Sequence, residues 1–272
     1  MIRAAVIGWP VSQSRSPLIH GHWLERFGID GDYGRLAIEP ERIDGFLAHF
    51  AGSGLAGGNV TIPYKEIAAR AARHCQPIVE RIGAANTLWM ENGELCADNT
   101  DGVGFIANLD DRAPDWAKTP DEALVLGAGG AAAAVVDALV ERGFMVRIVN
   151  RTLSRAEALA ARYPNRVSAD VLSEANRYAR TAGFIVNTTS LGMKGDGAVD
   201  LDMSVVPSDA VITDIVYVPL VTPFLAAAAA RGLRTVDGLG MLLHQAVPGF
   251  TRWFGHRPTV TPELRALVEA DL

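Results

Sequence analysis

Residues 123–143 read ALVLGAGGAAAAVVDALVERG, and this stretch decides the fold. The apolar residues 123–127 predict a short buried strand, and residues 130–143 predict a helix that ends at Gly143. The following residues, FMVRIVN (144–150), predict a second strand. A strand, a glycine turn, a helix and another strand form one βαβ unit, which is typical of a parallel sheet.

The turn inside this unit fits the pattern G-x-G-x-x-A, with Gly127, Gly129 and Ala132 at the defined positions. The first glycine allows a tight turn, the second lets main chain approach a pyrophosphate, and the small third residue permits helix–sheet packing. The start of the helix offers free N–H groups and the positive end of its dipole to phosphates. We therefore expect dinucleotide binding; the alternative is a glycine-rich turn that serves close packing only.

The end of the second strand indicates which dinucleotide is bound. Enzymes that use NAD usually carry Asp or Glu there, to bind the ribose 2′-hydroxyl. This chain has Asn150-Arg151-Thr152, with Arg155 one helical turn further on. A planar guanidinium suits a 2′-phosphate, so the sequence favours NADP. The alternative is that the two arginines form only the solvated start of a helix.

Strand and helix patterns alternate through the rest of the chain, which predicts an α/β fold of two lobes joined near residues 102–122. In the first lobe we expect a helix at 41–54 and a hairpin at 87–97 around Asn92-Gly93. Residues 110–122 are polar with two prolines, which indicates a surface connection. The last stretch, from about residue 238, has a helical pattern.

Composition excludes several classes of protein. The 272 residues are 49% hydrophobic and 21% charged, as in ordinary globular domains rather than disordered or fibrous chains. The formal net charge of −6 lacks the basic excess that is typical of nucleic-acid binders. The longest uncharged stretch, 215–230, is short for a membrane span and holds two prolines. The first residues lack the apolar run of a signal peptide, so we expect a cytoplasmic protein.

Cysteine and histidine spacing predicts neither a disulfide framework nor a metal site. Cys75 and Cys96 lie outside any C-x-x-C motif, and the six histidines form no H-x-x-x-H pair. We therefore expect no bound metal.

Polar residues cluster at two junctions of the first lobe. Ser14 and Ser16 precede a predicted helix, and Ser16 stands where a helix N-cap is expected before Pro17. Lys65 falls in the first turn of another predicted helix, where the dipole disfavours a cation. A residue that breaks a local rule is a candidate for function. The alternatives are a purely structural cap and a solvated lysine.

These stretches together resemble the shikimate dehydrogenase family. The motifs run in the family's order across nearly the whole chain. They are SQSRSP (12–17), NVTIPYK (59–65), GAANTL (83–88), NTDGVGF (99–105), GAGGAA (127–132), NRT (150–152), NTTSLGM (187–193), DIVY (214–217) and DGLGMLLHQA (237–246).

The resemblance implies reversible, NADPH-dependent reduction of 3-dehydroshikimate to shikimate in aromatic amino-acid biosynthesis. It assigns catalysis to Lys65 and Asp101. It implies a substrate domain at 1–102, a Rossmann-type NADP domain at 103–238, and C-terminal helices at 239–272 that return to the first lobe. The implied substrate-binding residues are Ser14, Ser16, Thr61, Asn86, Tyr217 and Gln245. The implied cofactor-binding residues are Gly127, Ala128, Gly129, Gly130, Ala131, Asn150, Arg151, Thr152, Arg155, Thr188, Met193, Ile215 and Gly238.

The residue types suit this chemistry. Reduction of a ketone leaves an alkoxide, and a lysine beside an aspartate can supply its proton. Hydroxyl and amide side chains suit a small polyhydroxy acid. The chain departs from the family at Gly21, where many members carry Asn, and at Ala131-Ala132-Ala133, which lacks the frequent Ser or Arg.

Two other functions stay open. One is a quinate-using relative, with NADP or NAD as cofactor, although such relatives tend to carry Thr at the second serine position, where this chain has Ser16. The other is a catalytically inactive NADP-binding regulator, against which the intact Lys65 and Asp101 count. We expect a small-molecule substrate, no nucleic-acid or membrane partner, and a monomer or a homodimer.

Overall fold

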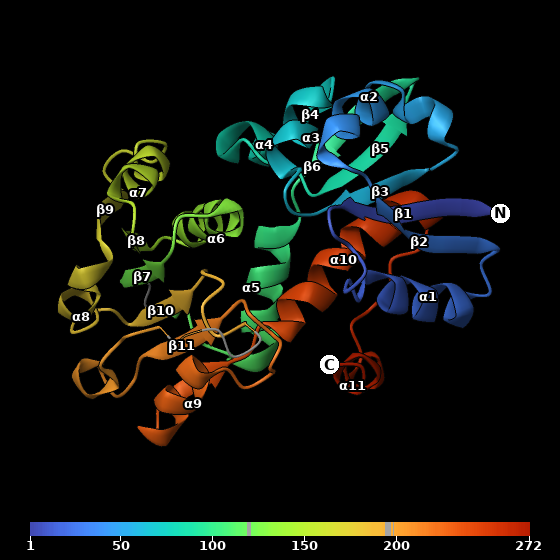
Figure 1. Cartoon of the computed structure of the whole chain (residues 1–272). Helices are drawn as coiled ribbons and strands as arrows, with labels where there is room; N and C mark the ends of the chain where they lie inside the picture. The colour runs from blue at the N-terminus through green and yellow to red at the C-terminus, as the bar shows by residue number, and fades with distance from the viewer. Residues whose placement is uncertain (119–120, 194–196, 198) are drawn as a thin grey trace. The chain divides into compact units, whose positions relative to one another are not determined.

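The computed structural model describes residues 1–118, 121–193, 197 and 199–272. They divide into two compact units. Unit 1 comprises Met1–Asp101 with Leu243–Asp271, and unit 2 comprises Gly102–Leu242 with Leu272. Each unit is built on a six-stranded sheet (Figure 1), which confirms the α/β class. In the described part of the chain, no helix is long and apolar enough to cross a bilayer.

The sheet of unit 1 has the order β2-β1-β3-β5-β6-β4. Neighbouring strands are parallel except that β5 runs antiparallel to both β3 and β6. Its strands are β1 (Ile2–Gly8), β2 (Gly31–Ala37), β3 (Gly57–Val60), β4 (His74–Cys75), β5 (Thr87–Glu91) and β6 (Glu94–Asp98).

Helices cover both faces of this sheet (Figure 1). On one face, a core that includes Ile7, Phe50, Tyr64 and Leu88 fills the space under α2, α3 and α4. On the other face lie α1 and α10. The helices are α1 (Ser16–Phe27), α2 (Ile43–Ala48), α3 (Lys65–Ala71), α4 (Pro77–Ile82), α10 (Leu239–Phe254) and α11 (Pro262–Glu269).

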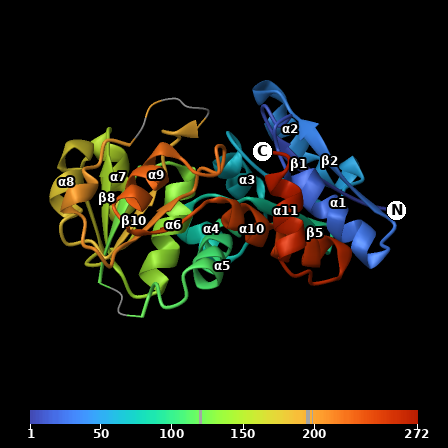
Figure 2. The same cartoon turned by 90° about the horizontal axis from the view of Figure 1, so that it is seen from below.

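The C-terminal helices pack on the N-terminal part of unit 1, as the family resemblance implies. Figure 2 shows α11 beside α1, and the two helices are in contact. The indole Nε1 of Trp253 on α10 donates a 2.9 Å hydrogen bond to the main-chain oxygen of Leu88 on β5. A Cβ at position 57 would lie 2.1 Å from that Nε1, so only glycine fits there.

A buried aromatic cluster joins α1, β2 and α10. The ring of His20 stacks on that of Tyr33, with centroids 3.9 Å apart, and contacts Trp23, Phe250 and Trp253. Burial lowers the pKa of His20 to about 3, with the side chain of Asn59 opposing this shift. Burial also raises the pKa of Tyr33. His20 is therefore a neutral core residue at physiological pH.

The sheet of unit 2 has the order β12-β11-β10-β7-β8-β9 with every pair parallel, which is the Rossmann arrangement. Its strands are β7 (Glu122–Leu126), β8 (Met145–Asn150), β9 (Val167–Val171), β10 (Phe184–Asn187), β11 (Val211–Asp214) and β12 (Arg234–Val236). Its helices are α5 (Asp101–Arg112), α6 (Gly130–Glu141), α7 (Leu153–Ala160), α8 (Ala175–Tyr178) and α9 (Pro223–Ala230).

Three sequence interpretations need correction. The expected helix at 41–54 is broken: α2 ends at Ala48, because His49 leaves the helical region and its ring bonds to the oxygen of Gly45. Ser16 is not an N-cap; it is the first residue of α1, after Arg15, and makes no cap bond. No helix was expected at residues 101–112, which form α5. Residues 119–120 of the expected connection at 110–122 lie outside the described residues.

Candidate functional site

The polar motifs of unit 1 meet at one edge of its sheet. β1 and β3 are parallel and in register, with Ile7 opposite Val60, so the chain segments that follow them leave the sheet side by side. β5 runs the other way and pairs Thr87 with both Asn59 on β3 and Asp98 on β6. The start of β5 and the ends of β1, β3 and β6 therefore share this edge. It carries Ser14, Ser16, Thr61, Lys65, Asn86 and Asp101.

Lys65 and Asp101 form an ion pair at this edge. The lysine Nζ lies 2.5 Å from the aspartate Oδ2, although the residues are 36 positions apart. Lys65 begins α3 and Asp101 begins α5, so two helix starts bring them together. Their side chains are only 18% and 9% exposed. A partly buried ammonium with a fixed carboxylate partner can deliver a proton at a defined position.

Two asparagines fix Asp101, one through its carboxylate and the other through its main-chain N–H. Asn86 Nδ2 donates to Asp101 Oδ1 at 2.8 Å. Asn99 Oδ1 accepts from the main-chain N–H of Asp101 at 3.0 Å, and its Nδ2 donates to the oxygen of Ala84 at 3.0 Å. Asp101 therefore uses one oxygen for Asn86 and the other for Lys65.

Sequence reasoning assigned no role to three further residues that surround this group. Thr87 donates to Asn86 Oδ1 at 2.8 Å, and Thr100 donates to the main-chain oxygen of Gln245 at 2.8 Å. Asn59 accepts a 2.6 Å bond from Tyr33 and donates to the oxygen of Asn86 at 3.2 Å. Each stands inside a motif that the resemblance used, and that position is the only signal in the sequence.

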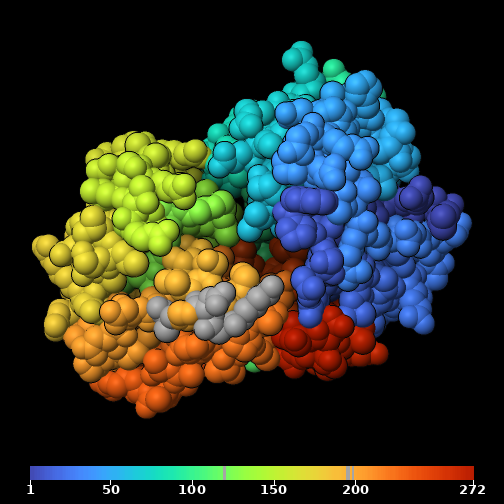
Figure 3. Space-filling view, viewed as in Figure 1, coloured from blue at the N-terminus to red at the C-terminus, as the bar shows by residue number. Residues whose placement is uncertain are grey.

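The segment that carries the two serines is held by arginines. Arg35 on β2 donates through Nη2 and Nε to the main-chain oxygen of Ser14, at 2.7 and 3.2 Å. Ser14 Oγ accepts from the N–H of Ser16 at 3.3 Å. Arg15 pairs with Asp271 near the C-terminus. The surfaces of the N- and C-terminal parts of the chain border each other (Figure 3).

Thr61 directly follows β3, where its main-chain N–H donates to the oxygen of Ile7 at 2.9 Å. A Cβ on Gly8 would lie 2.5 Å from Thr61 Cγ2, so this close approach requires glycine. Gln245, on α10, is buried and joins this group through Thr100.

In unit 2, the glycine turn lies between β7 and α6. Gly127 has a φ of +109°, and a Cβ there would lie 2.8 Å from Thr189, so the tight turn requires glycine. Positions 129 and 130 face open space at the start of α6. Main chain there is accessible beside a helix start, which is the geometry that accommodates a pyrophosphate. Ala128 and Ala131 complete the turn.

The residues after β8 fit the charge of a 2′-phosphate. Arg151 and Arg155 are exposed, and no carboxylate stands among residues 150–152. Asn150 Nδ2 donates to the oxygen of Thr152 at 2.8 Å, which closes the turn before α7. Two solvent-accessible guanidinium groups therefore follow β8, the strand that pairs with β7 before the glycine turn, where they can bind a phosphate.

The remaining cofactor candidates follow β10, which pairs with β7, and the next two strands of the sheet, β11 and β12. Thr188 donates to the oxygen of Leu126 at 2.8 Å, whereas Met193 is 42% exposed. Ile215 and Tyr217 follow β11. A Cβ on Gly238 would lie 2.6 Å from the carbonyl of Ile215, so glycine is required there too.

Asp214, at the end of β11, organises these loops. Its carboxylate accepts from Asn187 Nδ2 at 3.0 Å, the N–H of Val216 at 3.0 Å and Thr222 Oγ1 at 2.7 Å. Burial raises the pKa of Asp214, and these hydrogen bonds oppose the shift.

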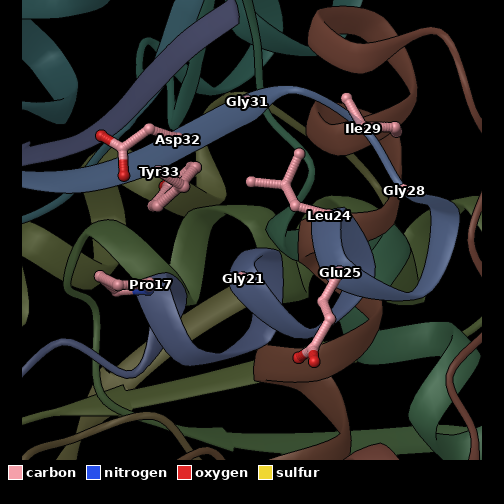
Figure 4. Close-up of a pocket in the computed structure, with 9 residues that line it drawn as sticks. All are labelled: Pro17, Gly21, Leu24, Glu25, Gly28, Ile29, Gly31, Asp32 and Tyr33. Carbon is pink, nitrogen blue, oxygen red and sulfur yellow. The ribbon is translucent and has the colours of Figure 1, made fainter. Parts of the chain in front are cut away.

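One pocket of about 450 Å³ lies between α1 and β2 (Figure 4). It is lined by Pro17, Gly21, Leu24, Glu25, Gly28, Ile29, Gly31, Asp32 and Tyr33. None of the predicted site residues lines it, so it is separate from the Lys65–Asp101 edge. Within the described ranges, no group of three or more His, Cys, Asp or Glu side chains could hold a metal ion.

The Rossmann sheet of unit 2 and the Lys65–Asp101 ion pair of unit 1 indicate a two-unit α/β dinucleotide-binding protein. Comparison with family models supports this class over most of the chain. Residues 6–88 match the shikimate dehydrogenase substrate binding domain, residues 113–219 match shikimate / quinate 5-dehydrogenase, and residues 238–262 match the shikimate 5′-dehydrogenase C-terminal domain. The chain belongs to the shikimate dehydrogenase family, which confirms the resemblance seen in its motifs.

Individual relatives cover the full length. The chain is 55% identical over 273 residues to shikimate dehydrogenase (NADP(+)) of Azorhizobium caulinodans, covering 100% of this chain and 97% of that relative. It resembles the crystal structure of shikimate 5-dehydrogenase from Thermus thermophilus in complex with NADP(H) and shikimate, with a TM-score of 0.87, 36% identity and 100% coverage of both chains. Quinate dehydrogenase from Corynebacterium glutamicum in complex with NAD gives a TM-score of 0.90 at 28% identity, with 99% coverage of both chains.

Proposed function

We propose that this chain is an NADP-dependent shikimate dehydrogenase, which interconverts 3-dehydroshikimate and shikimate. The observation that carries the proposal is the Lys65–Asp101 pair, 2.5 Å apart at a sheet edge lined with hydroxyl and amide side chains. The curated relative with 55% identity has this activity in its name. We place the enzyme in aromatic amino-acid biosynthesis in the cytoplasm, acting as a monomer or a homodimer.

In the reducing direction, the carbonyl carbon gains a hydride and the carbonyl oxygen gains a proton. Bound NADPH supplies the hydride. The ammonium of Lys65 donates the proton to the developing alkoxide, while Asp101 holds that ammonium in position. In the oxidising direction, the pair takes the proton from the substrate hydroxyl. Because the two groups are in direct contact, the proton belongs to the pair rather than to either residue.

The substrate-binding role is assigned to Ser14, Ser16, Thr61, Asn86, Tyr217 and Gln245. Hydroxyl and amide groups can both donate and accept hydrogen bonds, as the hydroxyls and carboxylate of shikimate require. A site built this way rejects analogues that lack a hydroxyl. We assign residues 1–102 and 239–272 to the substrate domain.

The NADP-binding role is assigned to residues 103–238. Gly127, Ala128, Gly129, Gly130 and Ala131 would hold the pyrophosphate, and Asn150, Arg151, Thr152 and Arg155 the 2′-phosphate. Thr188, Met193, Ile215 and Gly238 would hold the remainder of the cofactor. The fit rests on the open space at positions 129 and 130 and on the exposed arginines.

A quinate dehydrogenase is the second candidate, because a structural relative that carries that name was solved with NAD. The absence of an acidic residue at 150–152 favours NADP over NAD. The test is a four-way assay of the purified chain with shikimate or quinate and NADP or NAD. We expect the highest kcat/KM with shikimate and NADP. A higher value with quinate or NAD would transfer the chain to the second candidate, and no turnover would indicate an inactive regulator.

A further inference from the structure

We propose that Thr100 is a positioning residue that fixes the Asn86 amide and, through it, the Lys65–Asp101 pair. This inference rests on the proposed function for its kinetic readout. Thr100 is 2% exposed and stands directly before Asp101. Its side chain contacts Asn86 and Thr87 at the start of β5 and Gln245 on α10.

The bonds around Asn86 leave its amide one orientation. Its Oδ1 accepts from the main-chain N–H of Thr100 and from the hydroxyl of Thr87, each at 2.8 Å. Its Nδ2 donates to Asp101 Oδ1 at 2.8 Å and to Thr100 Oγ1 at 3.1 Å. If the amide were flipped, its oxygen would face the carboxylate of Asp101, and its NH₂ would face the N–H of Thr100.

The hydroxyl of Thr100 has a single proton. The shortest acceptor is the main-chain oxygen of Gln245 at 2.8 Å, whereas Asn86 Oδ1 lies at 3.2 Å and already has two closer donors. The hydroxyl therefore donates to Gln245 and accepts from Asn86. It links α10, which carries Gln245, to the amide that holds Asp101.

Asn86 is consequently saturated by the protein. Both of its N–H groups and both lone pairs of its oxygen have partners inside unit 1. A fully satisfied buried network fixes geometry, and a network that loses one member does not. Asn86 thus positions Asp101 in addition to the substrate-binding role proposed above, for which it would exchange one of these partners. Thr100 is the residue that keeps the amide directed at Asp101.

The test compares Thr100→Val with Thr100→Ser and with Thr213→Val. Thr213 is the matched control, because it is also 2% exposed and its hydroxyl also donates to a main-chain oxygen, that of Val236, at 2.8 Å. We expect Thr100→Val to lower kcat about tenfold and to shift the pH profile of kcat, since misplaced acid–base groups lose rate steeply. We expect KM for shikimate to rise and KM for NADP to stay unchanged. Thr100→Ser should restore most of the rate.

A second readout needs no turnover. Acetylation of Lys65 by an N-hydroxysuccinimide ester, followed by mass spectrometry, reports how firmly its ammonium is held, with exposed Lys118 as the internal reference. We expect at least about twofold faster labelling of Lys65 in Thr100→Val than in wild type or Thr213→Val, because a loosened pair opens more often. If Thr100→Val does not fold, Thr100→Ala removes the same hydroxyl and is compared in the same way.

The outcomes separate the two proposals. Wild-type protein that oxidises no shikimate would contradict the proposed function, and the labelling would still decide the role of Thr100. The second outcome is an active wild type and a Thr100→Val variant with unchanged kcat, pH profile and Lys65 labelling. If that variant loses only thermal stability, as Thr213→Val does, Thr100 is a structural residue and not a positioning residue.

Discussion

Arg15 and Asp271 are 256 residues apart in the chain and form an ion pair beside the two serines. The guanidinium lies 2.9 Å from the carboxylate and donates to the main-chain oxygen of Asp271 at 2.5 Å. Arg15 also donates to the oxygen of Gln13 at 2.7 Å. The segment that carries Ser14 and Ser16 therefore depends for its shape on a residue that follows the last helix.

Asp271→Ala should raise KM for shikimate about threefold and leave kcat nearly unchanged, because exposed pairs are worth about 0.2–1 kcal/mol. Arg15→Met should have a similar effect, and the double variant should not exceed the larger single effect by much, since the two residues interact. Steady-state kinetics at low and high salt measures this. The matched control is Arg26→Met, which removes an ion pair with Glu263 that joins α1 to α11, the helices that Arg15 and Asp271 flank. An equal rise in KM for the control would show that α11 as a whole, and not this pair, matters.

Lys65→Ala should lower kcat by about 10²- to 10⁴-fold with KM for shikimate within a few fold, because general acid–base groups contribute on that scale. Asp101→Asn should lose rate similarly. The double variant should lose much less than the product of both, because the two residues act as a unit. Lys118→Ala is the control. A Lys65→Ala enzyme that keeps half the wild-type kcat would remove Lys65 from the mechanism.

Arg151→Ala should raise KM for NADP by at least about tenfold and change KM for NAD little, because a hydrogen bond to a charged partner contributes roughly 1.5–3 kcal/mol. Arg155 stands nearby and can share the phosphate, which would soften the single variant. Arg166→Ala removes an exposed arginine at the opposite edge of the sheet, next to the start of β8, and serves as the control. Equal increases for both cofactors would point to adenine stacking instead.

His20 makes stability depend on pH. Because its pKa is lowered from 6.5 to about 3, the unfolded chain binds a proton below pH 6.5 that the folded chain does not bind until about pH 3. Its stabilising contribution is complete above pH 6.5 and declines as the pH falls from there toward 3.

The wild type loses about 1.4 kcal/mol of unfolding free energy per pH unit below 6.5 through His20. Between pH 7.5 and 4.5, His20→Phe should therefore lose roughly 2–3 kcal/mol less unfolding free energy than the wild type. Urea unfolding at several pH values measures this dependence. Trp23→Phe, in the same aromatic cluster, should lower stability and keep the wild-type pH dependence. If His20→Phe and wild type fall in parallel, another group controls the acid response.

The β7–α6 unit could be predicted because its signals are local: an apolar run, a glycine turn and a helix in succession. α5 could not, because Asn99 and Asp101 look like turn residues in the sequence. In the structure their turn is the start of a helix, in which Asn99 Oδ1 accepts from the N–H of Asp101. The short strands β9 and β12 could not be predicted either, because neither contains an apolar run.

The site residues also differ in whether local sequence signals indicate them. Lys65 drew attention from the sequence itself, since a cation at a helix start breaks a local rule. Its partner Asp101 came only through the family resemblance, because pairing across 36 residues depends on sheet topology. The role of Thr100 could not be predicted because its contact with Gln245 spans 145 residues, and its place in the NTDGVGF motif does not indicate that contact.

The composition of unit 1 also determines when it can fold during synthesis. Unit 2 is nearly continuous in the chain, whereas unit 1 needs residues 243–271. While the ribosome is still adding those residues, β5 lacks the Trp253 indole and the aromatic cluster lacks Phe250. At about 5–20 residues per second, the first hundred residues wait on the order of ten seconds for these partners. The usual N-terminal-first order is therefore reversed: unit 2 folds during elongation, and the edge that carries Lys65 and Asp101 is completed last.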